Sequence, residues 1–325
     1  MSRAGAVAVL VLLAGVILSL AVGRVWLAPA TLLEGIFAPK PNLAWLILTE
    51  LRLPRTILGL LVGASLGLSG AVLQGLLRNP LAEPGLLGVS AGAALGAVIA
   101  IYFGLSASFA LATPMLGIAG ALATGALTLA FGRGGTLTMI LAGAAVSGLA
   151  GAGLSLALNF APSPYAAYEI TTWLLGSLAD RDWSQVALAA PLMLAGWACL
   201  AATARGLDAL TLGEAQAESL GIDLARTRAL ALAGTALAAG AATSVTGAIG
   251  FVGLVAPHLV RPFVGHQPGR LLLPSALLGA ALLLFADVAT RLIPTAVELR
   301  LGVLTSLIGT PFFFWLVLRL KRTSP

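Results

Sequence analysis

Residues 84–132 read PGLLGVSAGAALGAVIAIYFGLSASFALATPMLGIAGALATGALTLAFG and contain no Asp, Glu, Lys or Arg. A helix that crosses a bilayer needs about 20 mostly apolar residues. The stretch is therefore long enough for two spanning helices joined by a turn, which we place at 86–105 and 115–131. This part of the chain predicts an α-helical membrane protein.

The rest of the chain is equally apolar. Of the 325 residues, 59% are hydrophobic and 9% are charged, whereas a soluble domain carries roughly 25% charged residues. The mean hydropathy is +1.03. We expect an all-α polytopic membrane protein with about ten spans, at 4–22, 57–77, 86–105, 115–131, 139–160, 183–202, 229–245, 249–264, 271–290 and 304–318. The span at 249–264 is the least regular, because Pro257 and Arg261 lie inside it, and a broken helix is one interpretation of it.

Glycines recur every four residues at Gly59, Gly63 and Gly67, inside the second predicted span. In lipid, helices associate through small residues that allow their backbones to approach closely. The glycine stripe therefore predicts a helix face that packs tightly against another helix.

The distribution of Lys and Arg predicts how the chain is oriented, because cytoplasmic loops carry the excess of these residues. With the N-terminus inside, eleven of the 18 basic residues fall on the inner side and seven on the outer side. We therefore expect both termini and the segment 205–228 in the cytoplasm. The outer segment 24–55 contains several prolines and is predicted to be mostly extended, with at best a short helix.

The segment 205–228 is a polar island between two apolar runs. It holds seven of the chain's charged side chains: Arg205, Asp208, Glu214, Glu218, Asp223, Arg226 and Arg228. Thr211 and Glu214 have the spacing of a capping box, which predicts a short helix at 212–220. Gly221 fits the left-handed residue that ends a helix, and Asp223 can cap the next one. We interpret the island as a short helix at the inner surface, with an ordinary solvated loop as the alternative.

The sequence lacks the motifs of an energy source or a hydrolytic site. A Walker A loop needs a glycine-rich turn that ends in Lys-Ser or Lys-Thr, but the lysines are only Lys40 and Lys321, and neither follows a glycine. The two histidines, His258 and His266, do not form an H-E-x-x-H metal motif. Asp287 is the only acidic residue within a predicted span. It lies four residues before Arg291, a spacing that favours an ion pair over a proton relay.

Three classes of protein remain open from the residues alone. The first is the membrane subunit of a pump that a separate ATPase drives. The second is an ion-coupled secondary transporter, which normally shows several buried carboxylates or interrupted helices near the midplane, and this sequence has few. The third is a membrane enzyme, for which the catalytic groups are missing.

Two long blocks carry a family resemblance. GASLGLSGAVLQ at 63–74 and RNPLAEPGLLGVS at 78–90 resemble the signature of bacterial ABC importer permeases for vitamin B12, iron-siderophores and haem. Further matching blocks are RLPR at 52–55, WLLGSL at 173–178, LGE at 212–214, GAIGFVGLVAPHLVR at 247–261, LPSALLG at 273–279 and GTPFF at 309–313. The signature residues with a structural role would be Gln74, Arg78, Asn79, Pro80, Pro257 and Asp287.

The resemblance implies a particular assembly. It implies a single permease domain over residues 1–325, with a cytoplasmic coupling-helix loop at about 205–226. Two copies would form a homodimer with the translocation pathway at their interface, in the cell inner membrane. The partners would be two cytoplasmic ATP-binding subunits and a periplasmic substrate-binding protein, with no nucleic acid. The chain itself would be non-catalytic and bind no cofactor, since ATP and Mg would bind to the ATPase.

The resemblance also implies three sets of site residues. ATPase coupling would fall on Thr211, Leu212, Gly213, Glu214, Ala217, Glu218, Leu220 and Gly221. Docking of the binding protein would fall on Arg52, Arg55 and Arg291, since Arg is the preferred cation for bidentate carboxylate contacts, with anchoring to lipid headgroups as the alternative. The cytoplasmic gate would fall on Gly134, Gly135 and Thr136.

One position departs from the family pattern. The family usually has Glu-Leu-Pro where this chain has Glu298-Leu-Arg300. The arginine frees the backbone and adds an outer charge, which could attract an anionic substrate or the binding protein.

The leading hypothesis is a permease for haem or a ferric siderophore. Cobalamin (vitamin B12) is the alternative, and an ion-coupled secondary transporter is a more distant one.

Overall fold

The computed structural model describes residues 3–23, 26, 28, 30, 42–294 and 298–323, and these contain helices and no β-strand. Arg24 and Lys40, two of the basic residues predicted on the outer side, lie outside the described residues. The helices in chain order are α1 (Arg3–Ala21), α3 (Leu43–Leu46), η1 (Ile47–Arg52), α4 (Leu53–Leu76), η2 (Pro84–Leu87), α5 (Val89–Tyr102), α6 (Leu105–Ser108), α7 (Ala112–Phe131), α8 (Thr136–Asn159), α9 (Pro164–Leu174), α10 (Trp183–Ala202), α11 (Ala204–Leu210), α12 (Glu214–Ser219), α13 (Leu224–Thr246), α14 (Val252–Val260), η3 (Arg261–Phe263), α15 (Pro268–Leu292) and α16 (Leu301–Thr323).

Seven helical segments in the described part of the chain are long and apolar enough to cross a membrane. Two shorter apolar helices, Val7–Ala21 and Val89–Tyr102, accompany them. The prediction of an all-α, multi-pass membrane protein is therefore confirmed. Each of the ten predicted spans overlaps a helix of the structure.

The predicted extended conformation of the segment before α4 is wrong for its last part. From Leu43 onward the chain is helical, and α3, η1 and α4 form one continuous helical segment that ends at Leu76. Asn42 caps the start, since its side chain accepts a hydrogen bond from the Trp45 amide at 2.8 Å. Pro54 is accommodated because the π-helical turn η1 precedes it, and such turns absorb local departures from α geometry.

The span predicted at 249–264 is broken, as its proline and arginine indicated. Gly247 and Phe251 have left-handed φ angles of 75° and 67°, so α13 ends and the short α14 begins only at Val252. Pro257 lies inside α14 and lacks the N–H that would bond to the carbonyl of Gly253. The side-chain amide of Gln74 in α4 points to this carbonyl instead, with an Nε2–O distance of 3.5 Å.

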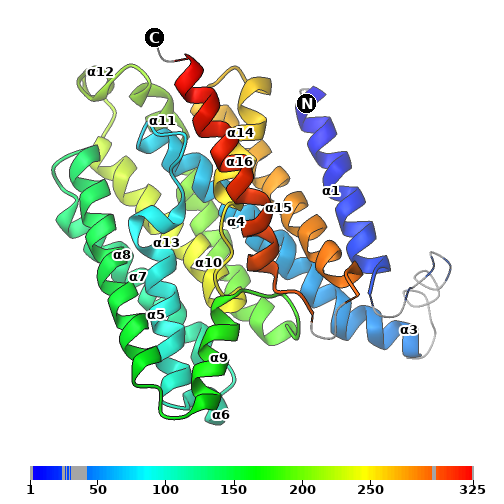
Figure 1. Ribbon diagram of the computed structural model, residues 1–325. Helices are drawn as coiled ribbons and strands as arrows, with labels where there is room; N and C mark the ends of the chain where they lie inside the picture. The colour runs from blue at the N-terminus through cyan, green and yellow to red at the C-terminus, as the bar shows by residue number, and fades with distance from the viewer. Residues whose placement is uncertain are drawn as a thin grey trace.

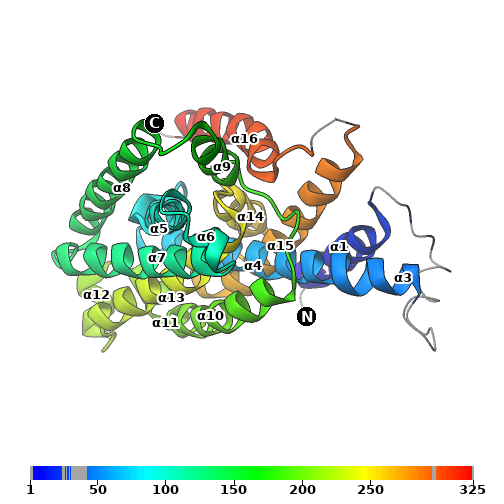
Figure 2. The same ribbon diagram turned by 90° about the horizontal axis from the view of Figure 1, so that it is seen from below.

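Helix α4 forms the centre of the bundle and packs against α10, α13, α14 and α15 (Figure 2). Its glycines allow this. A Cβ atom added to Gly63 would lie 2.5 Å from the carbonyl oxygen of Gly279 in α15, and one added to Gly70 would lie 1.8 Å from that of Gly253 in α14. Within the predicted stripe, a Cβ atom on Gly67 would also meet a carbonyl of α15, that of Ser275 at 2.2 Å, whereas one on Gly59 would meet the Leu284 side chain. The stripe therefore marks close helix packing, as predicted.

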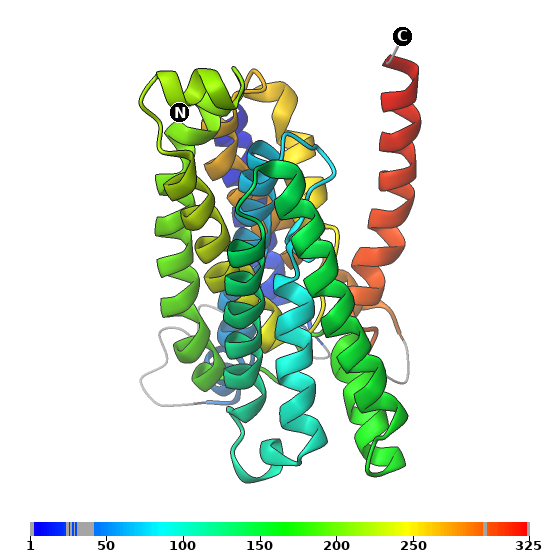
Figure 3. The ribbon, with the colours of Figure 1, turned by 90° about the vertical axis from the view of Figure 1, so that its left-hand side faces the viewer.

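The two ends of the bundle carry different features. The start of α1 and the end of α16 lie at the same end as α11 and α12 (Figure 1). The opposite end carries η1, the C-terminal end of α1 and the C-terminal end of α15. Helix α16 stands away from the rest of the bundle (Figure 3), and large apolar side chains such as Leu307 and Phe314 are exposed on it.

Candidate coupling site and arginine pocket

The polar island folds as two short helices joined by a tight turn at Thr211–Gly213. The predicted capping box is wrong: the Thr211 hydroxyl donates to the Asp208 carbonyl of α11 at 2.6 Å, and Gly213 is the N-cap of α12, without a side-chain cap. The Thr211 hydroxyl bonds to a preceding carbonyl because residues 204–210 already form a helix, α11, which the spacing of the residues did not indicate. Helix α12 is therefore shorter than the predicted 212–220 and begins at Glu214.

The C-terminal end of α12 follows the prediction. Gly221 has a left-handed φ of 81°. Its amide donates to the Glu218 carbonyl at 2.9 Å, and the Ile222 amide donates to the Ala217 carbonyl at 3.1 Å, which is the Schellman pattern. Asp223 caps α13, because its side chain accepts from the Arg226 amide at 2.9 Å.

Helix α12 has one buried contact and apolar flanks. Ala217 is fully buried in the hydrophobic core, which fixes α12 against the bundle. Leu212 and Leu220, on either side of the helix, are 61% and 64% exposed. Glu218 is also exposed. The predicted coupling residues therefore divide into an anchor and an exposed set.

Glu214 joins three segments of the chain. Its Oε1 accepts a hydrogen bond from the Thr136 hydroxyl at the start of α8, at 2.9 Å, and its Oε2 lies 2.9 Å from the Arg228 guanidinium of α13. The pKa of Glu214 is below its usual value, mainly because Arg228 donates a hydrogen bond to the carboxylate. The Thr136 hydroxyl and the charge of Arg78 lower this pKa further, and the smaller effect of burial opposes them. The structure thus brings together a predicted coupling residue and a predicted gate residue.

The predicted gate residues form the turn between α7 and α8, at the same end of the bundle as α12 (Figure 1). Gly135 is the N-cap of α8, with a φ of 112°. Thr136 is the first residue of α8, and its contact with Glu214 ties this turn to α12. Sequence reasoning missed the contact because Thr136 and Glu214 are 78 residues apart.

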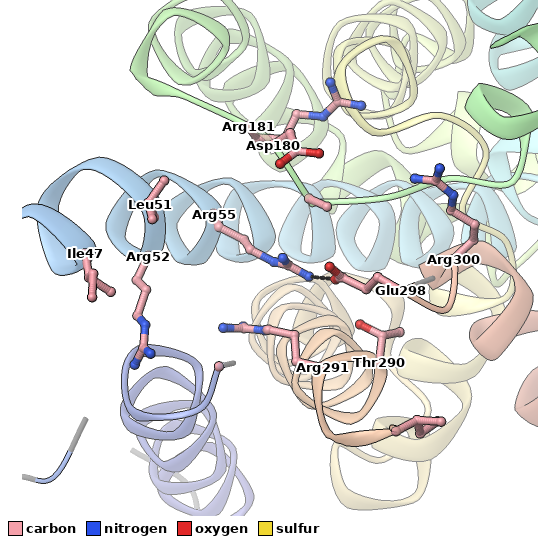
Figure 4. A pocket seen from close by; sticks show the side chains of 13 residues that line it. Ile47, Leu51, Arg52, Arg55, Asp180, Arg181, Thr290, Arg291, Glu298 and Arg300 are labelled. Atoms are coloured by element: carbon pink, nitrogen blue, oxygen red, sulfur yellow. Dashed lines mark hydrogen bonds and ion pairs between the residues drawn. The ribbon is translucent and has the colours of Figure 1, made fainter. Parts of the chain in front are cut away.

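At the opposite end of the bundle lies a cavity of about 570 Å³, which we call the arginine pocket. Figure 4 shows its charged side chains, which come from η1, α4, α15 and two connecting segments. Its lining residues include Arg52, Arg55, Arg181, Arg291 and Arg300, together with Asp180 and Glu298. The three residues predicted to dock a binding protein are therefore close together.

Asp287 is buried beside the arginine pocket and is paired with two of its arginines. Arg55 donates to the Asp287 carboxylate from Nε at 3.0 Å and from a terminal nitrogen at 2.8 Å. Arg291 forms an ion pair with the same carboxylate, and Arg55 forms one with Glu298. The predicted Asp287–Arg291 pair is confirmed. Arg55 is the partner that sequence reasoning did not identify.

Arg52 and Arg291 bind the C-terminal end of α1. Arg52 donates to the Ala21 carbonyl at 2.8 Å, and Arg291 donates to the carbonyls of Ser19 and Val22, both at 2.9 Å. The last carbonyls of a helix lack intrahelical partners and carry partial negative charge, so cations bind well there. Both side chains are buried or nearly so. The docking role of Arg52, Arg55 and Arg291 stays a prediction, and the structure gives each of them an internal partner.

Five of the six predicted signature residues, Gln74, Arg78, Asn79, Pro80 and Pro257, lie in α4, the turn after α4 and α14, whereas Asp287 lies in α15 beside the arginine pocket. Arg261 donates to the Gln74 side chain, whose amide faces α14. Asn79, which precedes Pro80, accepts from the Leu81 amide at 2.9 Å and shapes the turn after α4. Arg78, in the same turn, has a left-handed φ of 48°.

Comparisons with known proteins agree with this architecture. The family model for the FecCD transport family matches residues 11–319. The chain is 41% identical over 284 residues to the hemin transport system permease protein HmuU of Yersinia pestis, covering 86% of this chain and 85% of that one. It is 38% identical over 314 residues to the vitamin B12 import system permease protein BtuC of Klebsiella pneumoniae, covering 95% and 92%.

A solved structure shares the fold. It is an inward-facing conformation of a metal-chelate type ABC transporter, with a TM-score of 0.84, 33% sequence identity, and coverage of 96% of this chain and 97% of that one. The helical membrane fold, the matched family and these relatives lead to the same conclusion. The chain belongs to the FecCD transport family, as a membrane permease of the ABC importer type.

Proposed function

We propose that the chain moves a large metal chelate, haem or a ferric siderophore, across the inner membrane of a bacterium. Relatives named for hemin and for vitamin B12 are similarly close to it, at 41% and 38% identity, so cobalamin is the alternative cargo. Two cytoplasmic ATP-binding subunits supply the energy, and ATP and Mg bind to them, while this chain contributes no catalytic group or cofactor. A periplasmic protein delivers the chelate.

Two copies of the chain form the transporter, with the pathway between them. The exposed apolar face of α16, with Leu307, Ile308 and Phe314, supports a surface that a second copy or lipid covers, because monomers rarely leave large contiguous apolar patches uncovered. Each copy has about ten spans when α1, α5 and α14 are added to the seven long segments. Both termini and α12 lie in the cytoplasm.

Helix α12 is the coupling helix, and the observation that carries this proposal is the shared carboxylate of Glu214. The exposed Leu212 and Leu220 fit an apolar cleft on the ATPase, while the buried Ala217 makes α12 move with the bundle. When the ATPase displaces α12, Glu214 transmits the displacement to Thr136 at the start of α8 and to Arg228 in α13. The turn at Gly134 and Gly135 then opens or closes the pathway.

Uptake by proteoliposomes tests the function. The chain is reconstituted with its ATP-binding subunits and its binding protein, and uptake of haemin, a ferric siderophore and cobalamin is measured with and without ATP. We expect ATP-dependent uptake of haemin or the siderophore complex. Uptake that needs a proton or sodium gradient and no ATPase would instead support a secondary transporter.

A further inference from the structure

Two of the five arginines that line the arginine pocket have no ion-pair or hydrogen-bond partner among the described residues. Arg52, Arg55 and Arg291 are held by α1 carbonyls or by carboxylates. Arg181 and Arg300 form no ion pair or hydrogen bond through their side chains with any residue that the structure describes. The Arg181 Nε is shielded from solvent and still lacks a hydrogen-bond acceptor. We call Arg181 and Arg300 the rim pair.

No carboxylate among the described residues lies within ion-pair distance of Arg181 or Arg300. Burial lowers the pKa of Arg181, Asp180 raises it from beyond ion-pair distance, and the charge of Arg300 lowers it again. Asp182 adds a weaker upward effect. Glu298, the other carboxylate in the pocket lining, turns toward Arg55 (Figure 4). Two cations that line one pocket and form no ion pair within the described part of the chain are suited to bind an anion, because each would gain a charge-assisted hydrogen bond.

An apolar cavity of about 740 Å³ is lined by the end of α9 and by α16, the helices next to Arg181 and Arg300 in the sequence, and by part of the connection between α13 and α14. Its two main walls are Leu174 and Leu175 at the end of α9 and one face of α16 from Gly302 to Pro311, and Ala248 and Gly250 complete the lining. The Gly302 amide donates to the Leu175 carbonyl at 3.1 Å, which joins the two walls. Arg300 immediately precedes α16, and Arg181 lies in the connection from α9 to α10. Each member of the rim pair is therefore close in sequence to one wall of the apolar cavity.

We propose that the rim pair binds the carboxylates of the cargo, and that the protein prefers metal chelates with carboxylate groups on an apolar body. The proposal rests on the proposed function and narrows its cargo. The arginine pocket and the apolar cavity both have volumes typical of ligand sites. A single acidic side chain of a docked protein would bind to the rim pair and leave the apolar cavity empty. Cobalamin carries amides in place of free carboxylates and a single phosphodiester anion, so the rim pair could hold it through one anionic group only.

The test compares two ligands that share one macrocycle. The purified chain in nanodiscs of phosphatidylcholine is titrated with haemin and with haemin dimethyl ester, whose carboxylates are esterified, and tryptophan fluorescence reports binding. A hydrogen bond to a charged group contributes about 1.5–3 kcal/mol. We therefore expect haemin to bind at least about tenfold more tightly than the ester.

Variants assign that preference to the rim pair. Arg181→Gln combined with Arg300→Gln should bind the two ligands equally, and Arg181→Lys combined with Arg300→Lys should keep part of the preference. Arg205→Gln combined with Arg226→Gln is the matched control, since both residues are exposed and lie at the other end of the bundle. Equal dissociation constants in the wild type, or an unchanged preference in the double Gln variant, would overturn the proposal.

The lipid of the nanodisc distinguishes a bound phosphate from a bound cargo. If phosphatidylglycerol in the nanodiscs abolishes the preference, the rim pair holds a lipid phosphate, and the proposal is wrong. The binding assay uses no ATPase and no binding protein, so its failure says nothing against an ATP-driven permease. Conversely, failure of ATP-dependent uptake with every cargo would reject the proposed function even if haemin binds.

Discussion

The carboxylate of Asp287 holds together residues from opposite ends of the sequence. It is 1% exposed and pairs with Arg55, 232 residues away, and with Arg291, one helical turn away. Arg291 in turn holds the last carbonyls of α1. One buried acid thus fixes α4, α15 and α1 relative to one another. Removing one member of such a buried group is costly, because the remaining charges lose their partner.

Asp287→Asn should therefore destabilise the protein by about 3 kcal/mol, as expected for a broken buried ion pair. The substitution keeps the side-chain shape, leaves Arg291 without its ion-pair partner and leaves Arg55 with Glu298 alone. Thermal unfolding in detergent, followed by tryptophan fluorescence, measures the loss. Asp208→Asn is a control of the same chemistry, because Asp208 receives hydrogen bonds from Gln267 and Gly269 and forms no ion pair with any described residue. Equal melting temperatures for the wild type and Asp287→Asn would contradict this role.

Local pairs could be predicted from the sequence at this scale, and distant ones could not. The four-residue spacing of Asp287 and Arg291 indicated their ion pair, and Gly221 and Asp223 indicated the end of one helix and the cap of the next. The contacts of Asp287 with Arg55 and of Glu214 with Thr136 depend on how the helices are arranged. No spacing in the sequence encodes them. The capping box at Thr211 was wrong because α11 engages this threonine first.

Helices α4 and α14 are in backbone contact, and this contact depends on a missing side chain. The Gly70 position faces the Gly253 carbonyl so closely that a Cβ atom would lie 1.8 Å from it. A backbone atom cannot rotate away as a side chain can, so the two helices would have to separate. The contact also positions the side-chain amide of Gln74 over α14. There it faces the Gly253 carbonyl, which lacks its usual donor because Pro257 has no N–H.

Gly70→Ala should consequently prevent α14 from packing on α4, with a loss of stability above the 1–3 kcal/mol that is typical of overpacking. Gly15→Ala in α1 is the matched control. Its new methyl group would lie 3.5 Å from Leu284 Cβ, an ordinary contact distance, and alanine favours a helix over glycine. Thermal unfolding and the yield of monodisperse protein measure both variants. A Gly70→Ala protein as stable as Gly15→Ala would show that the helices do not touch in this way.

The element boundaries followed from apolar runs wherever a helix is long and regular. The predicted span at 183–202 coincides with α10. The runs did not reveal the helix from Leu43 to Arg52, because the four prolines of the segment 24–55 suggested an extended chain. Pro54, which follows this helix, is accommodated by the π-helical turn η1. The apolar runs also placed the third span at 86–105, which is longer than α5. Helix α5 begins only after Gly88, whose φ of 79° is left-handed.

At the scale of the whole molecule, the two ends of the bundle have separate chemistry. One end carries α12 and the turn that begins α8, and the other carries the arginine pocket (Figures 1 and 4). Helix α13 starts beside α12, contacts Glu214 through Arg228, and runs through the core to the break at Gly247. A displacement of α12 therefore has a rigid path into the bundle. This arrangement suits a permease that receives energy at one end and cargo at the other.

The transport of chelate per ATP hydrolysed tests the coupling through Glu214 most directly. In the reconstituted transporter, Glu214→Ala and Thr136→Val should each leave ATP hydrolysis in place while chelate uptake per ATP falls by about tenfold, the scale of a typical coupling free energy between sites. Arg205→Gln, an exposed neighbour of the same end, should behave as the wild type. If Glu214→Ala and Thr136→Val carry as much chelate per ATP as the wild type, Glu214 does not couple the ATPase to the pathway.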